Sequence, residues 1–215
     1  MNCLPASTIF VVDDAPGIRI YLEYILRRAG YRVEVFVNAQ TFLDRPRFDG
    51  VGCLVLAIHM PGITGLELQK KLGREGNHIP IIFITQSRDV DEAVESMKQG
   101  AFDFFTKPFN VKKLLAAICK ALKAHRMLRQ ELAVTTDAHN LIATLTPRER
   151  EVLALVITGK LNKQMASELD ISEITVKVHR RRVMTKMKVT SVAELVRLTE
   201  RGHLGPQIGA ETQKR

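Results

Sequence analysis

Short apolar runs rich in β-branched residues alternate with helical patterns over the first 125 residues, and this alternation limits the possible folds most strongly. Five such runs are predicted to be strands: Thr8–Val12, Arg32–Val37, Gly52–Ile58, Ile79–Thr85 and Phe102–Thr106. Strands separated by helices are joined by right-handed crossovers, which build a parallel sheet covered on both faces. The pattern therefore predicts an α/β domain with a doubly wound, parallel, five-stranded sheet.

The helical patterns of this part fall between the strands. We predict helices over Gly17–Ala29, Ala39–Leu43, Gly65–Gly73, Val90–Gln99 and from Val111 to about Ala133. The last helix has a seam of heptad type at Leu114, Ile118, Ala121, His125, Leu128 and Leu132. The first half of this seam is expected to pack on its own domain, and the second half either projects as a linker or pairs with a partner helix. Thr135–Ala143 is interpreted as a looser connection.

Only helical patterns follow residue 144. Thr146, Pro147 and Glu149 are typical of a helix start, with an N-cap, a proline at the first position and a capping-box glutamate. Three more helices are predicted over Lys163–Leu169, from the Ser172 cap to about Lys188, and over Ser191–Arg201. We therefore divide the chain into an α/β domain (1–125), a helical linker (126–143) and an all-α domain of four helices (144–215).

The positive charge of the chain is concentrated in this last domain. The formal net charge is +9, and residues 144–215 carry 14 basic against 8 acidic side chains. A compact basic segment is typical of a domain that binds nucleic acid, although a solvated charged surface gives the same count.

Several classes of protein are disfavoured by composition. No run of about 18 apolar residues is present, so no membrane-spanning helix is predicted. The first residues reach Asp13 without a basic leader or a cleavage site, so no secretory signal is expected. Cys3, Cys53 and Cys119 are scattered and lack metal-ligand spacing, which favours reduced thiols. We expect a cytoplasmic protein without a membrane partner.

Polar residues stand where several predicted strands end. Asp13 and Asp14 follow the first strand, Thr85 ends the fourth, and Lys107 follows the fifth. The carboxyl ends of parallel strands meet at one edge of a sheet, where ligands collect. Two carboxylates suit Mg²⁺, and a hydroxyl and an ammonium group beside them suit a phosphoryl group. Taken alone, Asp-Asp after a strand is equally typical of a helix-capping turn.

Four stretches carry a family resemblance. They are Val11-Val12-Asp13-Asp14, the run from Cys53 to Gly65 that ends in His-Met-Pro-Gly-Ile-Thr-Gly, Ile82-Phe83-Ile84-Thr85, and Phe104-Phe105-Thr106-Lys107-Pro108-Phe109. Through them, residues 1–125 resemble the flavodoxin-like receiver domain of bacterial two-component response regulators. The resemblance implies that the third strand ends in an aspartate that takes phosphate from a sensor histidine kinase. Ala57 stands at that position.

The resemblance also implies roles for the other pocket residues. Asp14, a water held by Asp13 and the backbone carbonyl of His59 would bind Mg²⁺; Thr85 would hold the phosphoryl group, Lys107 would pair with it, and Phe104 would be the switch aromatic. A methyl group offers no oxygen to phosphorus or to a metal, so Ala57 excludes an acyl phosphate and weakens Mg²⁺ binding. Either an aspartate was replaced deliberately, which the otherwise intact pocket favours, or the receiver is naturally degenerate.

The third helix of the last domain has two different faces. At 100° per residue, one side carries Val176, Arg180, Val183 and Met187. The other side broadly carries Ile174, Lys177, Val178, Arg181, Arg182 and Thr185. One face can pack while the other enters a DNA major groove, where cations reach guanine edges and Val178 meets a thymine methyl group. A solvated basic face is the alternative interpretation.

Three stretches of the last domain carry a second resemblance. They are Leu145 to Leu153, Asn162-Lys163-Gln164-Met165-Ala166 and Thr175-Val176-Lys177-Val178-His179. Through them, Thr146 to Leu198 resembles the helix-turn-helix domain of the LuxR/NarL/FixJ type. The resemblance implies base contacts by Lys177, Val178 and Arg181. Lys163, Thr175 and the amide ends of the second and third helices are expected to hold phosphates, because helix N-termini favour anions. Arg182 is a further candidate DNA contact, since a long side chain can reach around the helix.

The two resemblances together predict a DNA-binding transcriptional response regulator, not an enzyme. The native form would be phosphorylated by a sensor histidine kinase and would form a homodimer on activation or on double-stranded DNA. The dimer face is expected over Val90–Gln99, Phe102–Thr106 and the helix from Val111. The alternative is a phosphorylation-independent regulator whose receiver binds a protein or a small ligand.

Overall fold

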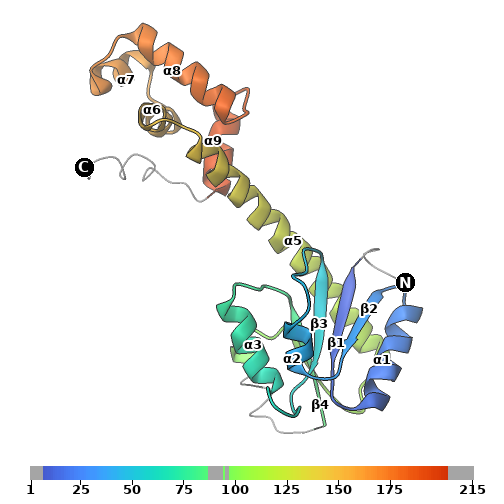
Figure 1. Cartoon of the computed structure of the whole chain (residues 1–215). Helices are drawn as coiled ribbons and strands as arrows, with labels where there is room; N and C mark the ends of the chain where they lie inside the picture. The colour runs from blue at the N-terminus through green and yellow to red at the C-terminus, as the bar shows by residue number, and fades with distance from the viewer. Residues whose placement is uncertain (1–6, 87–93, 95–96, 203–215) are drawn as a thin grey trace. The chain divides into compact units, whose positions relative to one another are not determined.

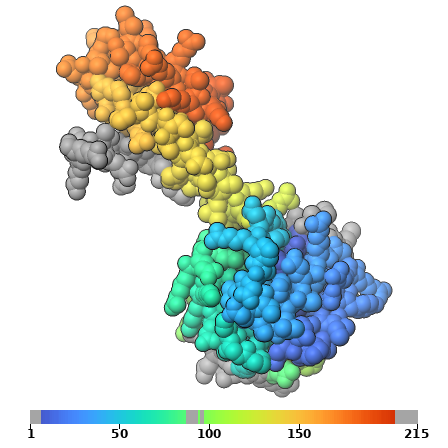
Figure 2. Space-filling view, viewed as in Figure 1, coloured from blue at the N-terminus to red at the C-terminus, as the bar shows by residue number. Residues whose placement is uncertain are grey.

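The computed structural model of the chain describes residues 7–86, 94 and 97–202, and these residues form two compact units. The first unit spans Met1–Arg129 and the second spans Gln130–Arg215. Blue to green colours mark the first unit and yellow to red colours mark the second in Figure 1 and Figure 2. Each unit is described by itself below.

The first unit is built on a parallel five-stranded sheet of order β2-β1-β3-β4-β5. The strands are β1 (Thr8–Val12), β2 (Arg32–Phe36), β3 (Gly52–Ala57), β4 (Ile81–Thr85) and β5 (Asp103–Thr106). Every neighbouring pair is parallel. The structure therefore confirms the predicted doubly wound parallel sheet.

Helices cover both faces of this sheet (Figure 1). They are α1 (Pro16–Arg28), α2 (Ala39–Leu43), α3 (Gly65–Arg74) and the first half of α5 (Val111–Ala143). Alternate residues of β1 point to opposite faces, as a period of two requires. Ile9 and Val11 lie in one core cluster with residues of α1 and α5, while Phe10 and Val12 lie in a second cluster with residues of α2 and α3.

The α5 helix continues without a break to Ala143, so the predicted loose connection over Thr135–Ala143 was wrong. The sequence from Val111 to Ala143 contains neither Gly nor Pro, and packing in the second unit holds its last turns in the helix. Ala138 is fully buried, and the Thr135 hydroxyl donates to the Arg201 carbonyl oxygen at 3.3 Å. The second half of the helix is therefore part of the second unit's core.

Four further helices complete the second unit: α6 (Pro147–Ile157), α7 (Asn162–Leu169), α8 (Glu173–Lys186) and α9 (Val192–Arg201). Their shared core contains Val152, Leu153, Met165, Val176, Val183 and Leu195. Thr146 and Glu149 form the predicted capping box, and the Ser172 hydroxyl accepts the Thr175 amide at the start of α8. The structure confirms the predicted group of four helices.

Two expectations concern the cysteines and the membrane. Cys53 is a fully buried free thiol, and burial raises its pKa. Cys119 is disulfide-bonded, so the expectation of reduced thiols was wrong there, because spacing along a sequence does not reveal which sulfur atoms meet. No helix of the described part is long and apolar enough to cross a membrane. The helix predicted over Val90–Gln99 lies largely outside the described residues, as does the tail after Gly202.

Candidate functional site

Asp13 and Lys107 meet at the carboxyl edge of the sheet, although β1 and β5 are not neighbouring strands. The Lys107 ammonium group donates to Asp13 Oδ2 at 2.7 Å, and the Ala15 amide donates to Asp13 Oδ1 at 2.9 Å. The Asp13 side chain is 2% exposed and that of Lys107 is 12% exposed. The charge of the buried carboxylate is therefore compensated by an ammonium group from the opposite half of the sheet.

The neighbouring polar residues lie at the same edge. Thr85 is buried at the end of β4, and its carbonyl oxygen accepts the Lys107 amide at 2.7 Å. Asp14 is exposed. The Arg19 guanidinium group donates to the backbone carbonyl oxygens of Asp13 at 2.6 Å and of Asp14 at 2.8 Å, which fixes the turn that presents both carboxylates.

Ala57 ends β3 in the middle of this edge and is 5% exposed. The chain turns back tightly behind it, because the Gly65 amide donates to the Ile58 carbonyl oxygen at 2.8 Å. A Cβ atom at Gly65 would lie 2.3 Å from the Ala57 carbonyl oxygen, so this close approach requires glycine. The turn leaves His59 exposed next to Ala57.

Phe104 of β5 packs against the core cluster that contains Ala57, whereas its neighbour Phe105 packs against the cluster on the other face. Phe104 is paired with the fully buried Phe83 of β4. The proposed switch aromatic is therefore half-buried on the same side of the sheet as Ala57.

The α8 helix of the second unit carries the second candidate site. Val176, Val183 and Met187 are buried, which confirms the predicted packed face of the helix. The predicted DNA-contact residues Lys177, Val178, Arg181 and Arg182 are all exposed on the remaining surface. A hollow of about 650 Å³ lies along this surface; it is lined by Thr146, Glu149, Val178, Arg181, Arg182, Thr185 and Lys186.

The residues around this face differ in how firmly they are held. The Thr175 hydroxyl lies 2.9 Å from the Ser172 hydroxyl at the start of α8, and Lys163 is exposed in the first turn of α7. Arg180 donates to Asn162 Oδ1 at 3.0 Å, which directs its guanidinium group toward α7. His179 is half-buried.

Ile174 is 74% exposed on the outer face of α8, as helical periodicity predicts.

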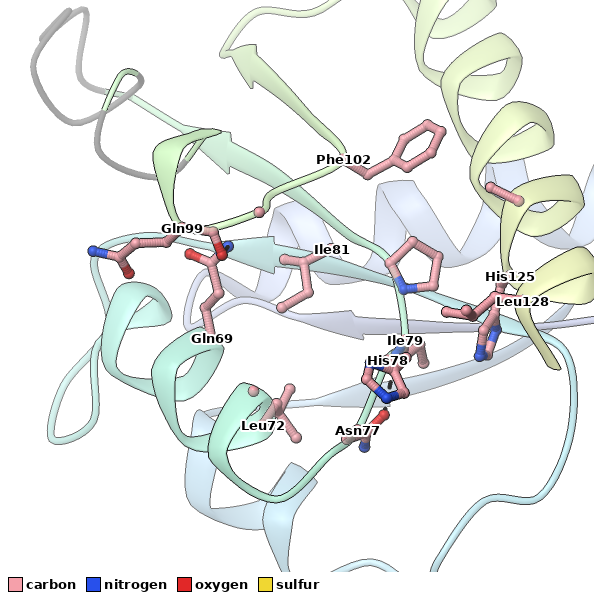
Figure 3. A pocket seen from close by; sticks show the side chains of 14 residues that line it. Gln69, Leu72, Asn77, His78, Ile79, Ile81, Gln99, Phe102, His125 and Leu128 are labelled. Atoms are coloured by element: carbon pink, nitrogen blue, oxygen red, sulfur yellow. Dashed lines mark hydrogen bonds between the residues drawn. The ribbon is translucent and has the colours of Figure 1, made fainter. Parts of the chain in front are cut away.

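One feature was missed by sequence reasoning. It is a pocket of about 460 Å³ at the amino ends of the strands, between α3, the start of β4 and α5 (Figure 3). It is formed by residues from distant segments, so no local signal identifies it.

This pocket has a polar and an apolar part (Figure 3). Gln69 donates to the Gln99 carbonyl oxygen at 3.2 Å on one side. On the other side, His125 of α5 lies beside Leu128, and its Nδ1 is 3.1 Å from the Gly52 amide nitrogen and 2.9 Å from the Gly52 carbonyl oxygen. Burial lowers the pKa of His125, against the opposing effect of its hydrogen bond to Gly52.

Comparisons with known proteins assign both units to families. Residues 9–119 match the response regulator receiver domain, and residues 143–199 match the bacterial regulatory proteins of the luxR family. The chain is 45% identical over 196 residues to the response regulator protein TodT of Pseudomonas putida, which covers 91% of this chain and 86% of TodT. It is 42% identical over 193 residues to the transcriptional regulatory protein FixJ of Bradyrhizobium diazoefficiens, covering 90% and 94% of the two chains.

Solved structures agree with this assignment. The structure of the response regulator StyR is similar with a TM-score of 0.84 and 46% identity, covering 91% of this chain and 98% of that chain. Full-length FixJ from B. japonicum gives a TM-score of 0.57 and 40% identity, covering 94% and 99%. Sequence, fold and order of domains all lead to one assignment: the chain belongs to the response regulators that join a receiver domain to a DNA-binding domain of the luxR family.

Proposed function

We propose that this protein regulates transcription by binding double-stranded DNA through α8, under the control of its receiver. The observation that carries the proposal is the exposed face of α8, where three cationic side chains surround Val178 on a domain of the luxR family. The opposite face of the helix is buried in the core, so the unit presents this surface as a fixed shape. The names of the relatives describe those proteins as regulators. By analogy, we propose that this chain acts as a regulator and not as an enzyme.

The residues of the interface are proposed to have three tasks. Lys177 and Arg181 donate to base edges in the major groove, and Val178 contacts a thymine methyl group. Lys163, Thr175 and the amide ends of α7 and α8 hold phosphates, because helix N-termini favour anions. Arg182 lies toward the side of the exposed face, where it reaches the DNA backbone.

Ala57 is proposed to occupy the position at which the native receiver carries its phosphorylated aspartate. Its place at the end of β3 supports this assignment, because β3 lies between β1, which Asp13 follows, and β4, which Thr85 ends. A methyl group has no lone pair that can attack phosphorus, so a sensor histidine kinase cannot phosphorylate this chain here. The other residues expected in the pocket are all present. This supports the interpretation that alanine replaced a native aspartate at position 57.

Receivers of this family generally hold Mg²⁺ beside the phosphorylated residue, and this pocket fits the ion only in part. Asp13, Asp14 and the His59 carbonyl would supply oxygens to a hydrated ion. Both Asp13 oxygens already accept hydrogen bonds, one of them from an ammonium group, and Ala57 supplies no oxygen. The proposed affinity for Mg²⁺ is therefore low in this chain.

Partners and location follow from the same proposal. The native protein would receive phosphate from a sensor histidine kinase in the cytoplasm and would form a homodimer on activation or on DNA. The dimer face is proposed over Val90–Gln99, β5 and the start of α5, of which Val90–Gln99 lies largely outside the described residues. A symmetric dimer would place two α8 helices on two half-sites.

A phosphorylation-independent regulator is the second candidate. The observation that favours it is the 460 Å³ pocket at the edge of the sheet opposite Ala57, which offers room for a small ligand. In that case the receiver would be a binding module, and restoring an aspartate at position 57 would not alter DNA binding.

Treatment with acetyl phosphate, followed by Phos-tag electrophoresis and DNA-binding titrations, separates the two candidates. The chain is compared with Ala57→Asp, and Ala57→Asn serves as an uncharged control. We expect a mobility shift and tighter DNA binding only for Ala57→Asp. Equal DNA binding by all three proteins with acetyl phosphate would overturn the switch and favour the second candidate.

A further inference from the structure

Ile174 is an apolar side chain on the surface where the cations of α8 gather. It is 74% exposed, the largest exposed fraction among the large apolar side chains of the described residues. A single exposed apolar residue is common and needs no function. Ile174 is not single, however, because Val178 is 45% exposed one turn later on the same helix.

The buried side of α8 shows where Ile174 points. Val183 is fully buried and lies nine residues after Ile174, which corresponds to a rotation of about 180° at 3.6 residues per turn. Ile174 therefore lies at the centre of the exposed face, in line with Val178 and Arg181. It is also the second residue of α8, two residues after the Ser172 cap.

We infer that Ile174 contacts the 5-methyl group of a thymine and makes the protein select thymine at one position of each half-site. This inference rests on the proposed function, that α8 binds DNA. The N-terminal residues of a recognition helix are those that contact base edges. Thymine alone presents a methyl group in the major groove, so it is the base edge that an isoleucine side chain recognises.

The flanking charges support DNA as the partner of this apolar stripe. Lys177 and Arg182 are exposed on opposite sides of the line from Ile174 through Val178 to Arg181. A groove lined by phosphates attracts these cations and brings the apolar side chains against the base edges between them. These exposed cationic side chains beside the stripe would not favour an apolar protein surface as its partner.

The test is a double-mutant cycle between protein and DNA. Duplexes are selected from a random pool with the full chain and with Ala57→Asp treated with acetyl phosphate. Each thymine of the selected site is then replaced by uracil, which removes only the methyl group. Besides the thymine proposed for Val178, one thymine per half-site should give about 4-fold weaker binding when it is replaced, the effect of removing one apolar carbon from contact. Ile174→Ala should be insensitive to uracil at that thymine.

Matched variants keep the result free of folding effects. Ile174→Val should retain part of the sensitivity to uracil, and Leu132→Ala, which truncates another exposed apolar residue of the second unit, should retain all of it. Selective binding with the same uracil sensitivity in Ile174→Ala at every thymine would overturn this inference and leave the proposed function standing. Binding without any sequence preference would overturn both.

Discussion

Lys177 and Lys163 are both exposed, but they have different tasks at the proposed interface. Lys177 lies beside Val178 in α8 and is proposed to reach base edges, so Lys177→Ala should cost roughly 1–3 kcal/mol of discrimination at one base pair. Lys163 lies in the first turn of α7 and is proposed to hold a phosphate. Lys163→Ala should therefore weaken binding to all sequences alike and reduce the salt slope by about 1. Footprinting at several salt concentrations measures both, and identical behaviour of the two variants would contradict the assignment.

His125 makes the stability of the receiver depend on pH. Desolvation of its ring, which is 7% exposed, lowers its pKa below the ordinary value of 6.5. The unfolded chain then binds more protons near that value, so the stability present above pH 6.5 is lost as the pH falls. Urea unfolding at pH 7 and pH 5 should show this loss, and His125→Gln should reduce it. His139→Gln, at an exposed position of the same helix, is the control; an equal reduction there would contradict the assignment.

Single residues also show how far the sequence predicts a site. Asp13 and Lys107 were placed at one edge because parallel strands end together, and the 2.7 Å contact between them agrees with that rule. Helical periodicity predicts Ile174 on the outer face of α8, and its exposed fraction of 74% agrees with that prediction. The contact of His125 with Gly52 could not be predicted, because 73 residues separate them and no motif links them.

At the scale of an element, the start of α6 depends on a reciprocal cap. The Glu149 amide donates to the Thr146 hydroxyl at 3.3 Å, and Glu149 Oε2 accepts the Thr146 amide at 2.8 Å. Thr146→Ala should cost about 1 kcal/mol of stability in the second unit, while Thr146→Ser should cost little. Hydrogen exchange of the α6 amides measures the difference, and equal protection in both variants would show that the hydroxyl does not stabilise the helix.

Elements with their own start and stop signals were predicted well, and the element without a stop signal was not. The bounds of β1 and α2 agree with the prediction, since turn residues or caps mark their ends. The α5 helix has neither Gly nor Pro near its predicted end, and its true end is set by packing of Ala138 in the second unit. Tertiary contacts of this kind lie outside local propensity.

At the scale of the whole molecule, charge is divided between the two proposed tasks. Most of the net charge of +9 belongs to residues 144–215, the part that is proposed to bind DNA. The receiver instead balances its buried Asp13 with Lys107 and keeps Asp14 exposed. A carboxylate added at position 57 would lower the net charge by only one unit. Its main effect would be on ion binding by the receiver, because it would lie beside Asp13 and Asp14.

Mg²⁺ should stabilise the receiver only when position 57 carries a carboxylate. An aspartate there would face Asp13 and Asp14, and repulsion among the three groups would make Ala57→Asp less stable than the chain when Mg²⁺ is removed. An ion that binds only the folded state reverses this loss. It adds about 2.7 kcal/mol to the free energy of unfolding when the Mg²⁺ concentration is 100 times the dissociation constant. Thermal unfolding is measured across a Mg²⁺ titration. Added Mg²⁺ should raise the Tm of Ala57→Asp and leave the Tm values of the chain and of Ala57→Asn almost unchanged. Equal shifts in all three proteins would mean that Mg²⁺ binds elsewhere and that Ala57 does not stand at the ion's site.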